Sequence, residues 1–199
     1  VNRFVPDAIG LGCTSLIYPS ACETAEVLKE RFGVPVFLGG THASLFPEHV
    51  MENPVWDFAV FGEGEETSVE LIDRLSRGES LGGVAGVIYR TEDGRVVQNK
   101  PRVPIGQLDD APLPAYDLLD LSRYSAPPMR IRKTPAVYME LFRGCAYAKC
   151  TYCTSGGGLK NRYRRHSPAG AAEKVLQIHM KYGANEIAFV DDDFVVGKD

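Results

Sequence analysis

The chain has 199 residues, of which 44% are hydrophobic and 24% charged, and its formal net charge is −4. This composition is ordinary for a globular protein that buries a core in one large domain or two small ones. The negative charge gives no overall attraction to nucleic acid or to an anionic membrane, and no apolar run approaches the ~20 residues of a membrane span. We therefore expect neither a membrane nor a nucleic acid among its partners.

The five cysteines indicate a reducing environment. They are odd in number and three of them are close together, which fits metal binding better than a disulfide framework. We therefore expect a cytoplasmic protein. The chain begins Val1-Asn2-Arg3, without a start methionine or a signal-like apolar segment, so we expect that its native N-terminus is absent.

The first part of the chain alternates predicted strands and helices. The sequence predicts that Ser20 and Glu23 form a capping box for the first helix and that Gly33 ends it. Strands are expected at residues 5–11, 34–38 and 56–61, and helices at 20–32, 47–52 and 66–77. Because parallel strands need long crossovers, this alternation predicts a partial doubly wound parallel α/β sheet of the Rossmann-like kind.

Glycine-rich loops follow each of these strands, at residues 12–16, 39–42 and 62–65. Ligands of parallel sheets bind beyond the carboxyl ends of the strands, and glycine lets a flat ligand approach the backbone. Each loop taken alone is explained at least as well by a tight turn between a strand and a helix. For three such loops on one sheet edge, a ligand site and plain turns are about equally good explanations of the glycines.

The pattern changes after residue 82. Residues 83–100 predict a β-hairpin that turns at Glu92-Asp93-Gly94, and residues 101–135 carry closely spaced prolines that predict an extended linker. Three regions follow: a sheet domain at residues 1–82, a hairpin and linker at 83–135, and a further domain at 136–199.

The last region predicts a strand, a cysteine loop, a helix and a second strand. The strands are expected at 136–142 and 186–190, and the helix runs from Ser167 and Pro168 to Gly183. This order is that of the first βαβ unit of a parallel barrel. The expected inner stripe of the helix consists of Ala172, Val175, Leu176, His179 and Met180, and the second strand ends in Asp191-Asp192-Asp193.

The loop of this unit places Cys145, Cys150 and Cys153 within nine residues. Three thiolates so close together can converge on one soft metal. A structural zinc site needs a fourth ligand, for which His166 is the nearby candidate, and a redox Cys-x-x-Cys pair is a second alternative. In a 4Fe-4S cluster, three cysteines leave the fourth iron open for a substrate or cofactor. Cys13 and Cys22, distant in sequence, are expected to be small packed side chains.

The segment Arg143-Gly144-Cys145 to Cys153 resembles the cluster loop of radical SAM enzymes. It departs from the commonest form in having four residues, not three, between the first two cysteines. The resemblance implies that the three cysteines are catalytic ligands of a 4Fe-4S cluster whose open iron binds S-adenosylmethionine. It also implies that Tyr152 packs near the adenine and that Asp192 or Asp193 accepts the ammonium group of that cofactor.

The sheet domain is similar to the cobalamin-binding domain found in front of many radical SAM barrels. The similarity rests on Gly-Gly-x-His after the second strand, Gly-Glu-Gly-Glu after the third, and Thr14-Ser15-Leu16 in the place of a Ser-x-Leu pattern. It implies that His42 is a loop residue that lines the corrin and that Glu63 touches amide side chains of the ligand. The implied cobalamin contacts are Thr14, Leu16, Gly39, Gly40, His42, Gly62, Glu63 and Gly64.

Together, these resemblances imply a fragment of a cobalamin-dependent radical SAM enzyme: a cobalamin-binding sheet followed by the start of a radical SAM partial TIM barrel. The expected reaction is reductive cleavage of S-adenosylmethionine to a 5'-deoxyadenosyl radical, with methyl transfer to an unactivated carbon of a small molecule or peptide. A flavodoxin or ferredoxin would supply the electron, and the fragment alone should be inactive. Two alternatives remain open: a radical SAM enzyme whose sheet domain is only a scaffold, and a zinc-binding interaction module.

Overall fold

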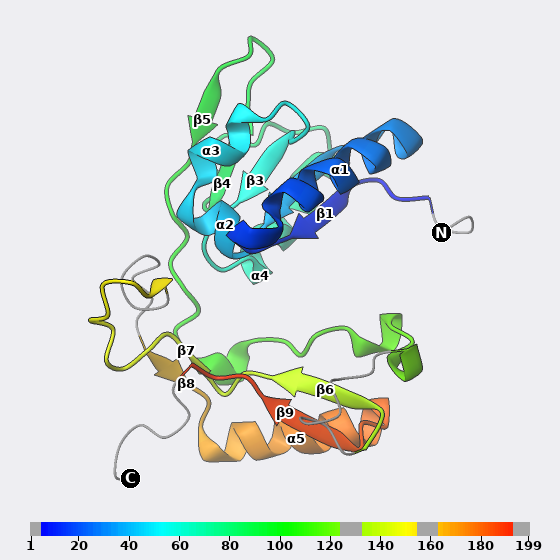
Figure 1. Ribbon diagram of the computed structural model, residues 1–199, viewed down its shortest axis with the longest axis vertical. Helices are drawn as coiled ribbons and strands as arrows, with labels where there is room; N and C mark the ends of the chain where they lie inside the picture. The colour runs from blue at the N-terminus through cyan, green and yellow to red at the C-terminus, as the bar shows by residue number, and fades with distance from the viewer. Residues whose placement is uncertain (1–4, 124–132, 155–162, 193–199) are drawn as a thin grey trace. The chain divides into compact units, whose positions relative to one another are not determined.

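The structure, a computed structural model, describes residues 5–123, 133–154 and 163–192 (Figure 1). It divides the chain into two compact units, Val1–Pro104 and Ile105–Asp199. Each unit has its own strands and its own buried apolar residues. In the described ranges, none of the helices combines the length and the apolar composition that crossing a membrane requires.

The first unit is built on a five-stranded sheet in the order β1-β2-β3-β4-β5. The strands are β1 (Ile9–Gly12), β2 (Val36–Gly39), β3 (Phe58–Val60), β4 (Val87–Arg90) and β5 (Val96–Gln98). The first three run parallel, in the register Leu11↔Leu38↔Ala59. The predicted parallel sheet is therefore confirmed, with strands shorter than the apolar runs that predict them.

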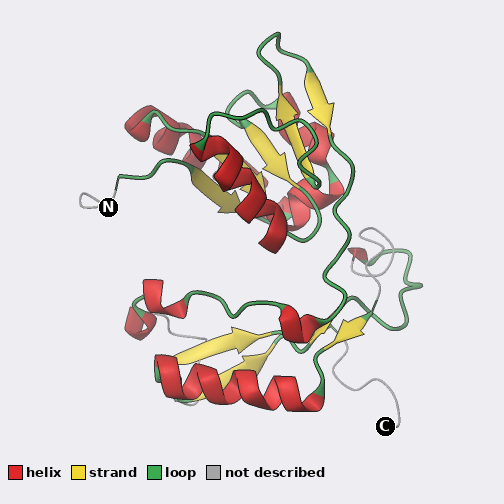
Figure 2. Ribbon diagram, turned by 180° about the vertical axis from the view of Figure 1, so that it is seen from behind, coloured by secondary structure: helices red, strands yellow, loops and turns green. Residues whose placement is uncertain are grey.

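Helices cover both faces of this sheet (Figure 2). Cys22 and Ala25 from α1 (Tyr18–Phe32), Ala43 from α2 (Gly40–Leu45) and Val50 from α3 (Pro47–Glu52) pack with the sheet in one buried cluster. On the opposite face, Leu71 of α4 (Glu65–Ser76) packs against β3 and β4. This two-sided cover explains why β3 is buried along its whole length.

The structure differs from the predicted elements in two places. The first helix begins at Tyr18, directly after the 3-10 turn η1 (Ser15–Ile17), so Ser20 lies inside the helix and is not its N-cap. Residues after Gly39, expected to be loop, form the short helix α2. Both differences shorten the predicted loops at the carboxyl ends of the strands.

The predicted hairpin is present, but it is not a separate region. β4 pairs with β3 in antiparallel fashion, and β5 pairs with β4. Val84, Val87 and Ile88 are fully buried. Residues 83–100 therefore complete the first unit, and its boundary lies at Pro104, not at residue 82.

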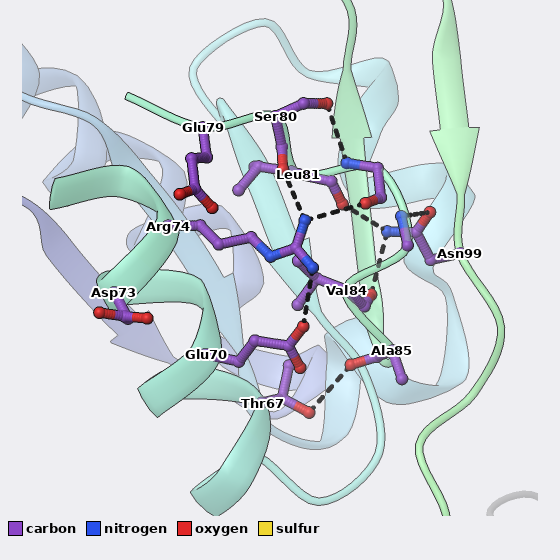
Figure 3. A network of polar contacts seen from close by, with 12 residues as sticks. Thr67, Glu70, Asp73, Arg74, Glu79, Ser80, Leu81, Val84, Ala85 and Asn99 are labelled. Atoms are coloured by element: carbon purple, nitrogen blue, oxygen red, sulfur yellow. Dashed lines mark hydrogen bonds and ion pairs between the residues drawn. The ribbon is translucent and has the colours of Figure 1, made fainter. Parts of the chain in front are cut away.

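A polar network fixes the connection between α4 and β4 (Figure 3). Arg74 of α4 donates to the carbonyls of Ser80 and Gly82 and pairs with Glu70. From the other side, Asn99 donates to the carbonyls of Leu81 and Val84, at 2.8 and 3.0 Å. Its Oδ1 atom also accepts from Gly83 N at 3.2 Å. These side chains satisfy backbone groups of a segment that has no ladder of its own.

The second unit contains a parallel pair of strands and one long helix. The strands β6 (Ala136–Met139) and β9 (Glu186–Phe189) pair in the register Val137↔Ile187, and α5 (Pro168–Tyr182) connects them. A second pair, β7 (Phe142–Arg143) and β8 (Arg164–Arg165), is antiparallel. The βαβ unit is thus confirmed, as is the Ser167 cap, whose Oγ accepts from Gly170 N at 3.0 Å.

Of the residues expected to form an extended linker, 105–123 pack onto this unit. They form three 3-10 turns: η2 (Leu108–Asp110), η3 (Tyr116–Leu118) and η4 (Leu121–Arg123). Leu108 is buried, and the Asp109 carboxylate accepts from Ser167 N at the start of α5, at 3.0 Å. A Cβ atom on Gly170 would lie 2.3 Å from that carboxylate, which explains the glycine in the first turn.

The predicted inner stripe of α5 is right at Val175 and wrong at the other four positions, Ala172, Leu176, His179 and Met180, which are exposed. Ile178 is fully buried against the strands, whereas Leu176 and Met180 are 58% and 81% exposed. The helix carries two apolar stripes one residue apart, and the stripe with the β-branched residues Val175 and Ile178 covers the strands. Periodicity alone does not distinguish the two.

We expect Asn99→Ala to lower the free energy of unfolding of the first unit by about 2 kcal/mol, because three hydrogen bonds to the connection are lost. Trp56, the single tryptophan, is buried in this unit, so its fluorescence during urea unfolding reports on the unit. Gln98→Ala, an exposed position of the adjacent strand, is the matched control. Equal losses for the two variants would contradict the assignment.

Candidate functional site

The structure joins the three glycine-rich segments at the carboxyl ends of β1, β2 and β3. Cys13, after β1, receives a backbone hydrogen bond from His42 and donates one to Gly39. Ser44 of α2 donates to the carbonyl of Gly40 and accepts from Gly62 N at 3.0 Å. The predicted grouping of these segments on one sheet edge is therefore confirmed.

Gly40 packs closely against the segment that follows β1. A Cβ atom on it would lie 3.1 Å from both the N and the O atoms of Cys13, and its φ of +85° is in the region that side chains avoid. Gly12 and Gly62, by contrast, face open space, since nothing lies within 4 Å of an added Cβ atom. Gly40 thus allows close packing, whereas Gly12 and Gly62 leave the backbone accessible.

Apolar side chains stand exposed on the same segments. Leu16 is 93% exposed, and Ile17 and Phe46 are about half exposed. Thr14, the residue that precedes η1, is also exposed. Bare backbone beside exposed apolar groups is suited to a large flat ligand with an apolar face. This edge therefore fits a corrin, and Thr14 and Leu16 are accessible on it.

His42 is not the loop residue that the sequence suggests. It lies in α2 and is only 5% exposed, so the expectation that it is a loop residue is wrong, and its contact with the corrin stays a prediction. Its Nδ1 atom contacts Ser15 Oγ at 2.9 Å, and its ring lies 4.1 Å from the ring of Tyr18. In the structure His42 lies beneath the segment that carries Thr14 and Leu16, and it supports that segment.

Burial keeps His42 in its neutral form. Desolvation lowers the pKa of this histidine, and the neighbouring His49 of α3 adds to the effect. Its Nε2 atom is buried without a hydrogen-bond partner among the described residues. The same environment raises the pKa of Tyr18 to about 12, chiefly through burial and next through Cys22. His42 and Tyr18 are therefore uncharged at neutral pH.

The third segment leads into α4. Gly62 has a φ of +80°, Glu63 and Gly64 are half-buried, and Gly64 is the N-cap of the helix. The N-cap of this helix is thus formed by the backbone of Gly64 and not by a side chain. Glu63 instead contributes its carbonyl, which accepts from Thr67 Oγ1 at 3.4 Å.

The cysteine loop follows β7. Cys145, Cys150 and Cys153 are half-buried free thiols, and a turn joins the last two through a Cys153 N to Cys150 O hydrogen bond of 3.2 Å. Ala148 has a φ of +46°, the one non-glycine residue of the described chain with a positive φ. It lies in the gap that is one residue longer than the common form. A positive φ is unfavourable for a residue with a side chain, so Ala148 is a strained position of this loop.

The prediction that this loop binds a metal rests on the type and spacing of its residues. Among the described residues, no three His, Cys, Asp or Glu side chains are grouped closely enough to share a metal ion. His166, the fourth ligand that a zinc site would need, contacts Asp109 through Nδ1 at 2.9 Å. The donor set of three free thiolates still fits an iron–sulfur cluster better than zinc, because it leaves the fourth position open.

The residues predicted to contact S-adenosylmethionine are exposed where the structure describes them. Tyr152 is 89% exposed, and Asp192 is exposed just beyond β9, so both are accessible to a ligand. Asp193 lies outside the described residues.

Asp191 is a residue whose role the sequence did not reveal. Its Oδ1 atom accepts from the backbone N–H groups of Leu141 and Phe142, at 2.7 and 2.6 Å. The sequence signal was a run of three aspartates, which does not tell one from another.

We expect the first unit to lose stability as the pH falls from 7 to 5. His42 has a lowered pKa in the folded state, so below about 6.5 the unfolded chain binds a proton that the folded chain does not. Urea unfolding followed by Trp56 fluorescence measures this slope. His42→Gln should flatten the curve; a variant with the full pH dependence of the native chain would contradict the assignment.

We expect Gly144→Ala and Ala148→Gly to act in opposite directions. Gly144 has a φ of +82°, so a side chain there should cost about 1 kcal/mol, whereas glycine at position 148 relieves a strained residue. Calorimetric unfolding of the second unit measures both. Destabilisation by Ala148→Gly that equals that of Gly144→Ala would contradict the backbone assignment.

Comparisons with known proteins agree with this geometry. Residues 1–72 match the B12 binding domain family. An uncharacterized methyltransferase of Pyrococcus horikoshii is 36% identical over 200 residues, which cover 100% of this chain and 42% of that protein. The anaerobic magnesium-protoporphyrin IX monomethyl ester cyclase of Synechocystis is 28% identical over 96% of this chain and 37% of its own length. The chain thus spans about two fifths of the length of these relatives.

A solved structure has the same fold. The cobalamin-dependent S-adenosylmethionine radical enzyme OxsB, with aqua-cobalamin and S-adenosylmethionine bound, matches with a TM-score of 0.72 and 25% identity. The match covers 96% of this chain and 26% of that one. In these matches and in its two-unit architecture, the chain is similar to the radical SAM proteins that carry a B12-binding domain.

Proposed function

We propose that the protein is a cobalamin-dependent radical SAM enzyme. The observation that carries the proposal is the combination of three free thiols on the loop after β7 with a glycine-rich edge on a B12-type sheet. A zinc module would account for the first feature and leave the second unexplained.

In this proposal Cys145, Cys150 and Cys153 hold a 4Fe-4S cluster, and Asp192 accepts the ammonium group of S-adenosylmethionine at the open iron. Tyr152 is available to pack on the adenine. When reduced, the cluster supplies the electron that cleaves the sulfonium. The chain's own residues orient the cofactor and shield the site from water.

Cobalamin would bind at the edge formed by the segments after β1, β2 and β3. Leu16 offers an apolar contact, and the accessible backbone at Gly12 and Gly62 admits the corrin. The backbone of Gly39 and Gly40 and the side chain of Thr14 border the same edge, followed by Glu63 and Gly64. His42 supports this edge through the contact of its Nδ1 atom with Ser15 Oγ.

Methyl transfer to an unactivated carbon is the reaction we propose first, because the Pyrococcus relative is named a methyltransferase. The cyclase relative keeps ring formation as a second outcome. The substrate is a small molecule or a peptide, and a flavodoxin or ferredoxin supplies the electron. We place the protein in the cytoplasm, where its thiols remain reduced.

We expect the anaerobically reconstituted whole protein to contain about four iron and four sulfide ions per chain. Reduced, and given S-adenosylmethionine, it should release 5'-deoxyadenosine and methionine. Changing Cys145, Cys150 or Cys153 to Ser should abolish both results, since each thiolate holds one iron. Cys22→Ser is the control, because that buried cysteine lies in the core of the first unit.

Three results would contradict parts of the proposal. One zinc ion and no sulfide per chain would favour the zinc-binding interaction module. An intact cluster without corrin absorbance, after incubation with cobalamin and desalting, would favour the scaffold domain. Iron content that survives serine at all three positions would exclude these cysteines as the ligands.

A further inference from the structure

Asp191 connects the end of the second barrel strand to the start of the cysteine loop. Its Oδ1 atom accepts the backbone N–H groups of Leu141 and Phe142, which lie 50 and 49 residues earlier in the chain. Phe142 begins β7, and Gly144 and Cys145 follow that strand directly. The carboxylate therefore binds the backbone just before the proposed cluster loop begins.

The position of this contact follows from the end of the parallel ladder. β6 ends at Met139, and Val190 N–H donates to the Met139 carbonyl at 3.2 Å. Beyond that point the two strands separate, and the Asp191 side chain continues the connection that the backbones no longer make. A carboxylate oxygen is a stronger acceptor than a neutral carbonyl, and here it accepts two successive N–H groups.

The aspartates after β9 differ in their surroundings. Asp191 is half-buried, and its Oδ2 atom is buried with no hydrogen-bond partner in the described part of the chain. Asp192 is exposed. Along β9, Ile187 packs toward α5, and neighbouring side chains of a strand point to opposite faces. Asp191 and Asp192, although consecutive, thus lie in different environments.

We infer that Asp191 is a positioning residue for the cysteine loop: its carboxylate fixes the backbone at Leu141 and Phe142 and so sets the direction in which Cys145 leaves the strand. The contact itself is independent of any cofactor. Its consequence for a cluster rests on the proposed function.

Hydrogen exchange of the apo form of the whole protein tests the contact. In the native protein, the amides of Leu141 and Phe142 should exchange much more slowly than the amide of exposed Tyr147. Asp191→Ala should accelerate both by roughly tenfold or more. Asp191→Asn keeps an acceptor oxygen and should restore most of the protection, and Asp192→Asn should leave both rates unchanged.

The reconstituted whole protein tests the consequence. We expect Asp191→Ala to bind less iron and to change the electron paramagnetic resonance spectrum of the reduced cluster, with recovery in Asp191→Asn. Slow exchange at Ile178 in α5 checks that the unit remains folded. A purely structural loss would lower iron content without changing the spectrum of the cluster that still forms.

Two results would overturn the inference. One is native exchange at Leu141 and Phe142 as fast as at Tyr147, a measurement that needs no variant and holds even if Asp191→Ala does not fold. The other is an Asp191→Ala protein whose amide rates and cluster spectrum equal those of the native protein. If the native protein binds no iron and sulfide, the proposed function fails while the exchange result still decides the contact.

Discussion

Parallel strand pairing is the constraint on which both units depend. It places the segments after β1, β2 and β3 at one edge of the first sheet, and it places the residues after β6 and β9 together in the second unit. The hydrogen bonds of Cys13 with Gly39 and His42, and of Ser44 with Gly62, are consequences of this alignment. Without it, the candidate residues would be scattered through nearly 200 positions of sequence.

In both units, a buried or half-buried polar side chain supports the segment that carries the accessible residues. His42 lies under Ser15, next to exposed Thr14 and Leu16, and Asp191 holds the backbone before Cys145. Such supporting contacts keep a site in one conformation before a ligand arrives. They also explain why residues near a site in sequence need not touch the ligand.

The chemistry that we propose needs little from acid or base groups of the protein. The cysteine thiols provide ligands, the glycine-rich edge provides accessible surface, and the cofactors provide the reactivity. This division is consistent with relatives in sequence that carry the names of different reactions, a methyltransferase and a cyclase. The specificity of such proteins lies in how substrate and cofactors are held.

The sequence by itself determined the elements set by local patterns: three parallel strands, the hairpin, the helix ends at Gly33 and Gly183, and the Ser167 cap. It also identified the cysteine spacing, because thiol chemistry depends on residue type. Only the tertiary structure decided that the hairpin joins the first sheet, that Ile178 and not Leu176 faces the strands, that His42 is buried, and that Asp191 bonds to residues about fifty positions away. Periodicity and capping act over a few residues, whereas these outcomes depend on which distant surfaces meet when the chain packs.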